Sequence, residues 1–115
     1  MKDVSFSLPV FYSQILNLIT LRAREFGYAI AVHGSMTRDL DVIAVPWIEE
    51  AADAEILVSA VCDLLNGFYL NYEDAEPTDY INRNPEPKPH GRLAWSIHLK
   101  GFKGYIDFSV MPRIK

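Results

Sequence analysis

The sequence predicts an α/β domain of the α+β kind: a mixed β-sheet of four or five strands with two helices packed on one face. Two long stretches carry apolar residues at helical spacing, and several shorter runs are apolar or alternate between apolar and polar. Their order along the chain is helix, two strands, helix, a possible strand, a loop and two strands. With 115 residues, of which 50% are hydrophobic, the chain suits a single domain over residues 1–115 with one core.

The first helix is predicted over residues 8–26. Phe11, Ile15 and Ile19 repeat at the spacing that places side chains on one helical face. Gly27 follows directly and is a typical residue for ending a helix. We therefore expect one apolar stripe on this helix to face the sheet.

Two strands and a second helix follow. The strands are predicted over residues 28–33 and 40–45, and Pro46 ends the second of them. The second helix is predicted over residues 49–66, with Gly67 as its stop signal and acidic residues in its first turn. Its core stripe consists of Ile56, Leu57, Ala60, Val61, Leu64 and Leu65.

The last part of the chain changes in character. Residues 68–72 are a possible short strand, and residues 73–91 form a polar loop with four prolines, which we expect to be flexible. Strands over residues 92–99 and 105–111 close the chain, and glycines flank their link, which favours a β-hairpin.

Three aspartates carry the functional prediction. Asp39 and Asp41 point to the same face of a strand because side chains alternate. Asp107 lies in an apolar strand near the C-terminus, and if the strands are neighbours it stands about 5 Å from one of the pair. Clustered carboxylates repel one another unless a cation binds, and Mg²⁺ (or Mn²⁺) prefers oxygen ligands. The alternative is the ordinary polar face of a strand.

Four further residues are candidates for nucleotide binding. Gly34 lets the backbone approach a phosphate, and the Ser35 hydroxyl can bind its oxygens. Arg38 precedes the acidic pair, and Arg92 contacts substrate if its strand face lies beside Asp107. The alternatives are an ordinary glycine turn, a surface salt bridge and exposed strand polarity.

Gly34 and Ser35 after one strand, Asp39 and Asp41 on the next, and Asp107 on a later strand together resemble the nucleotidyltransferase superfamily of the polymerase-β type. The resemblance covers nearly the whole chain. It implies a metal-dependent transfer of a nucleotidyl group from a nucleoside triphosphate to an unknown acceptor, with the three aspartates as catalytic metal ligands.

The chain departs from that family in one respect. Only three residues separate Ser35 from Asp39, whereas the family has a longer segment with a short helical stretch. The alternative function is therefore a catalytically inactive binding module or inhibitor that engages a nucleotide or a partner protein. A weaker possibility is an interaction protein that docks through its acidic strand face and proline-rich loop. The run HGSMTRDLDVIAVPW also resembles small proteins encoded by bacteriophages.

Composition restricts the partners and the compartment. A net charge of −4 argues against an extended nucleic-acid surface. The single cysteine, Cys62, is expected in the core and suits a reducing compartment. The chain shows neither a signal-peptide pattern nor an apolar run long enough to span a bilayer, so we expect a cytoplasmic protein without membrane contact. Trp47 and Trp95 are both expected in the core.

Overall fold

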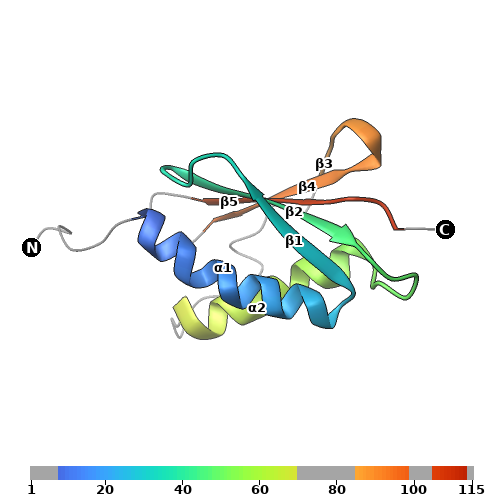
Figure 1. Ribbon diagram of the computed structural model, residues 1–115, viewed down its shortest axis with the longest axis horizontal. Coiled ribbons are helices and arrows are strands. Elements are labelled where there is room, and N and C mark those ends of the chain that lie inside the picture. The colour runs from blue at the N-terminus through green and yellow to red at the C-terminus, as the bar shows by residue number, and fades with distance from the viewer. Residues whose placement is uncertain (1–7, 70–84, 99–104, 114–115) are drawn as a thin grey trace, which may run out of the picture.

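The protein is a two-layer structure with helices on one face of a sheet. A computed structural model describes residues 8–69, 85–98 and 105–113. Two helices, α1 (Leu8–Glu25) and α2 (Ala54–Tyr69), lie together below a mixed five-stranded sheet (Figure 1). The strands are β1 (Tyr28–His33), β2 (Asp39–Pro46), β3 (Glu86–Pro87), β4 (Leu93–His98) and β5 (Tyr105–Val110). The predicted fold class is confirmed.

The strand order in the sheet is β1-β2-β5-β4-β3. Strand β2 pairs with β5 in parallel, and the other neighbours are antiparallel. A parallel pair needs a crossover connection, and α2 lies in the chain between these two strands. The two central strands are thus distant in sequence and adjacent in space, which is what positions the candidate site.

The core lies between the sheet and the helices. On β2 every second side chain up to Pro46 is buried, and on β5 the same alternation holds apart from Ser109, as expected for a sheet with one covered face. Trp95 and Cys62 are buried there, as predicted. The largest fully buried side chains from the two layers include Tyr12, Ile15, Ile19, Leu57, Leu65, Leu40, Val42, Ile97, Ile106 and Phe108.

The predicted start of the second helix was wrong by five residues. Helix α2 begins at Ala54, and residues 49–53 form turns and irregular structure. The Ala52 amide donates to the Phe26 carbonyl over 3.0 Å, and the Ala51 side chain is buried. This segment is therefore held against the end of α1, and tertiary hydrogen bonds replace the helical ones that its sequence favours.

The close approach of this segment depends on Gly27. Its φ is +89°, and a Cβ atom there would lie 2.7 Å from Ala51 Cα. The Trp47 amide donates to the Gly27 carbonyl over 3.1 Å. The Trp47 side chain is 59% exposed, so its predicted place in the core was wrong. Trp47 directly follows the buried Pro46, the last residue of β2.

The predictions for the later segments were partly wrong. Residues 68 and 69 complete α2 and are not strand, because the helical pattern continues through Gly67. Residues 70–72, 73–84 and 99–104 lie outside the described residues. Within the predicted loop, residues 85–91 contain the edge strand β3 and a 3-10 turn, η2 (Pro89–Gly91). A proline is compatible with an edge strand because its missing N–H faces away from the ladder. Strands β4 and β5 pair antiparallel as predicted.

Candidate carboxylate site on the open sheet face

A row of polar side chains crosses the sheet on the face turned away from the helices, called here the open face. His33 pairs with Asp41, Asp41 pairs with Asp107, and Asp107 pairs with Ser96, each on the neighbouring strand. Neighbouring strands are about 4.8 Å apart, so the Asp41 and Asp107 backbones lie at that spacing. The parallel register of β2 and β5 thus places two of the three predicted aspartates directly opposite each other.

The third aspartate lies in the next row. Asp39 pairs with Tyr105, and Tyr105 pairs with His98. The Tyr105 and His98 rings stack with centroids 5.4 Å apart. Burial raises the pKa of the Tyr105 hydroxyl, the Asp39 charge raises it further, and so does the hydrogen bond to the Asp39 side chain. Asp39 therefore faces the same side as Asp41 and is engaged by a tyrosine.

The turn between β1 and β2 packs closely against the Asp41 carboxylate. Gly34 has a φ of +89°, and a Cβ atom there would lie 3.2 Å from Asp41 Oδ2. Glycine is thus needed both for the backbone conformation and for the approach of the carboxylate. The Ser35 and Thr37 hydroxyl oxygens are 2.8 Å apart, and the Thr37 amide donates to Ser35 Oγ over 3.4 Å. The Ser35 hydroxyl is consequently engaged within its own turn.

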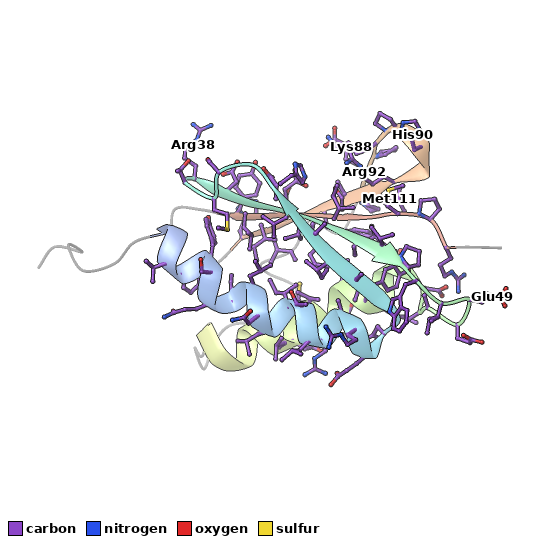
Figure 2. All side chains as sticks on the ribbon, in the orientation of Figure 1. Arg38, Glu49, Lys88, His90, Arg92 and Met111 are labelled. Carbon is purple, nitrogen blue, oxygen red and sulfur yellow. The ribbon has the colours of Figure 1, made fainter. Side chains whose placement is uncertain are left out.

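A buried tyrosine anchors the far end of this turn. Tyr12 on α1 is fully buried, and its hydroxyl donates to the Arg38 carbonyl over 2.6 Å. Burial raises the pKa of Tyr12, and the nearby charge of Asp39 adds to this. The Arg38 side chain is exposed and points away from the sheet (Figure 2). Sequence reasoning missed Tyr12, although a tyrosine on an apolar helical face needs a partner for its hydroxyl.

Nitrogen-bearing side chains lie at the opposite end of the open face. Lys88, His90 and Arg92 lie above the sheet around β3 and η2, far from Arg38 (Figure 2). The Lys88 amide donates to the Arg92 carbonyl over 2.8 Å. Arg92 Nε is buried, and no hydrogen-bond partner for it exists among the described residues. Sequence reasoning did not identify Lys88 as a candidate site residue, because it predicted a loop for the segment that contains Lys88.

The charges around Asp107 are mixed. Burial raises the pKa of Asp107 first, and the charge of Asp41 raises it further. The charges of Lys88, His33 and Arg92 act in the opposite direction and lower it. Two carboxylates at strand spacing with cations around them suit a ligand that brings a divalent cation and an anionic group together.

The carboxylates supply the hard oxygen donors that Mg²⁺ and Mn²⁺ prefer. Within residues 8–69, 85–98 and 105–113, the side chains as they stand form no group of three or more His, Cys, Asp or Glu that could hold a metal ion. Asp41 and Asp107 form the paired part of the predicted set, and Asp39 is two residues along the same strand face. The donor chemistry therefore fits a divalent cation held first by that pair.

Comparison with known proteins gives no independent assignment: no family model matches the chain, and no curated protein matches it. Among the described segments, no helix is long and apolar enough to cross a membrane.

Proposed function

We propose that this domain is a metal-dependent nucleotidyltransferase that moves a nucleotidyl group from a nucleoside triphosphate to an acceptor still to be identified. The observation that carries the proposal is the pairing of Asp41 with Asp107 across the parallel β2–β5 ladder. Carboxylates whose pKa values are perturbed by burial and by a neighbouring like charge cluster at functional sites. The Gly34 turn packs close beside Asp41, because a Cβ atom on Gly34 would lie 3.2 Å from Asp41 Oδ2.

Each residue has a defined part in this proposal. Asp41 and Asp107 would hold Mg²⁺ or Mn²⁺, with Asp39 as the third ligand once its hydrogen bond to Tyr105 is released. A bound divalent cation would neutralise phosphate charge and lower the pKa of the attacking hydroxyl. Gly34 would keep the turn backbone close to Asp41, because a side chain there would crowd the Asp41 carboxylate. The acidic pair itself keeps anions away until the cation is bound.

Calorimetry with pyrophosphate detection tests this function. The intact chain is titrated with each nucleoside triphosphate in the presence of Mg²⁺ or Mn²⁺, and pyrophosphate release is followed with candidate acceptors. We expect metal-dependent binding and release in the native protein and neither in Asp41→Asn or Asp107→Asn. Asp63→Asn, an exposed carboxylate on α2, is the matched control. Undiminished binding and turnover in a folded Asp41→Asn protein would exclude the mechanism.

A binding module without catalysis is the second candidate. It is favoured by the short turn before Asp39 and by the hydrogen bond that engages the Ser35 hydroxyl with Thr37. This candidate predicts saturable, metal-dependent nucleotide binding with no pyrophosphate release under any condition, or binding of a partner protein at the same face. Release of pyrophosphate that requires Asp107 would exclude it.

A further inference from the structure

The segment around β3 forms a raised hairpin beside the carboxylates. Glu86 pairs with Ala94 on β4, and the Lys88 amide donates to the Arg92 carbonyl over 2.8 Å. The hairpin turns at Gly91, whose φ is +77°. It rises above the sheet on the side opposite the helices (Figure 1). This raised hairpin, residues 86–92, is called the wall below. It holds the backbones of Lys88 and Arg92 next to each other.

Small side chains lie on the sheet next to this wall. Ala94 and Ser109 pair across β4 and β5, one row along from Asp107 and Ser96. Both face the open side, yet Ala94 is only 6% exposed and Ser109 only 5%. Other groups therefore cover this row, and the hairpin is the described segment that rises at this end of the sheet (Figure 1). The wall and the row of Ala94 and Ser109 therefore lie beside the Asp41–Asp107 pair.

The positively charged side chains of the wall, Lys88 and Arg92, make only weak interactions within the described part of the chain. Lys88 Nζ lies 3.4 Å from Glu86 Oε1, and exposed ion pairs of this kind contribute little in water. Arg92 Nε is buried with no hydrogen-bond partner there, and an unpaired buried donor is unfavourable. The ion pairs within 4.0 Å among these residues do not include one between Asp107 and either cation.

We infer that Lys88 and Arg92 form the phosphate-binding subsite of the open face, in place of the shortened turn at Gly34 and Ser35. A guanidinium offers a fork of donors that matches phosphate oxygens, and a neighbouring ammonium adds a point charge. The sequence predicts that the Ser35 hydroxyl binds phosphate, but this hydroxyl already forms a hydrogen bond with the Thr37 hydroxyl. The adjacent carboxylates disfavour a simple anion and favour a polyphosphate that carries a divalent cation.

This subsite rests on the proposed function only for the identity of the natural ligand, a nucleoside triphosphate. It is tested with inorganic tripolyphosphate, which has neither base nor sugar, by calorimetry on the intact chain with Mg²⁺ and with a chelator. Single variants Lys88→Met and Arg92→Met keep an unbranched, largely apolar stem and lose the charge. We expect each to weaken tripolyphosphate binding roughly ten-fold or more, since charge-assisted hydrogen bonds are lost.

Arg24→Met is the matched control, because Arg24 is exposed on α1, on the other side of the sheet. Arg92→Lys adds a second comparison: it keeps the charge but lacks the Nε donor, so we expect the salt dependence of binding to persist while affinity falls. Circular dichroism and thermal unfolding establish that each variant is folded. Equal losses in Arg24→Met and Arg92→Met would mean that only net charge matters, and would overturn the inference.

The two proposals fail differently. Tripolyphosphate binding that requires Lys88 and Arg92, without nucleotidyl transfer to any acceptor tried, would support the subsite and favour the binding module over the enzyme. Transfer that requires Asp41 in a protein whose Lys88→Met and Arg92→Met variants bind tripolyphosphate like the native chain would support the enzyme and overturn the subsite.

Discussion

Replacing Asp41 by asparagine should make the metal-free protein more stable while removing its response to metal. Asp41 and Asp107 are paired on neighbouring strands, which lie about 4.8 Å apart. Two unit charges about 5 Å apart repel by roughly 1 kcal/mol in water and by roughly 3 kcal/mol at the effective dielectric of a protein surface. Both side chains are partly exposed, so the lower value applies. We expect Asp41→Asn to gain about 1 kcal/mol at pH 7, a rise in Tm of about 4 °C.

The pH dependence gives this prediction a second signature. The pKa of Asp107 is raised above its ordinary value of 3.8, by burial first and by the Asp41 charge second. The folded state therefore holds the Asp107 proton more tightly than the unfolded chain does. Stability from this group is present below pH 3.8 and is lost as pH rises through the higher folded pKa. In Asp41→Asn that loss should be smaller, because the Asp41 charge no longer raises the pKa of Asp107.

Thermal unfolding with and without Mn²⁺ measures both effects. The native protein should gain stability as Mn²⁺ is added, because a ligand that binds only the folded state shifts unfolding. Asp41→Asn should have a higher Tm than the native protein without metal, and its Tm should not rise when Mn²⁺ is added. Asp63→Asn, distant from the site, should match the native protein in both measurements. A lower Tm for Asp41→Asn together with a preserved response to Mn²⁺ would refute the reasoning, since it would mean that Asp41 stabilises the sheet and does not bind metal.

Three further changes test the packing around the site and the core. Gly34→Ala should cost about 1 to 2 kcal/mol, because its φ is +89°, and should weaken Mn²⁺ binding, because the new Cβ would lie 3.2 Å from Asp41 Oδ2; chemical denaturation and calorimetry would measure the two effects. Gly27→Ala should cost more than Gly34→Ala in the same denaturation assay, because its Cβ would lie 2.7 Å from the Ala51 backbone. Burial raises the pKa of the Cys62 thiol to about 12, so a thiol reagent at pH 8 should label it only after denaturant is added; rapid labelling of the native protein would contradict its burial.

Several elements could be predicted because local signals were strong. The helix α1 has a regular apolar stripe followed by Gly27, and β2 is an eight-residue run that becomes wholly apolar after Asp41 and ends at Pro46. The start of α2 could not be predicted, because the hydrogen bond from Ala52 to the Phe26 carbonyl joins segments that local pattern does not connect. The burial of Trp47 was wrongly predicted for a related reason: hydrophobicity alone predicts burial, but Trp47 follows the last residue of β2 and is exposed.

Some residues of the candidate site could likewise be predicted from the sequence, and others could not. Alternation alone places Asp39 and Asp41 on one face, and the Gly34 turn is evident from composition. Lys88 could not be found, because its role depends on a short edge strand within a segment whose prolines indicate a loop. Tyr12 was missed because its hydroxyl contacts a turn on the other side of β1 in sequence.

The sequence by itself determined the fold class, the helices and strands in outline, and the residue types that can bind a cation and a phosphate. Periodicity and residue chemistry are local properties, so they can be read without knowing which segments meet. Only the tertiary structure decided that β2 and β5 pair in parallel with Asp41 opposite Asp107, and that Lys88 and Arg92 stand together above the same face. Strand order and register depend on the packing of α2 and the sheet as a whole, and no single segment carries that information.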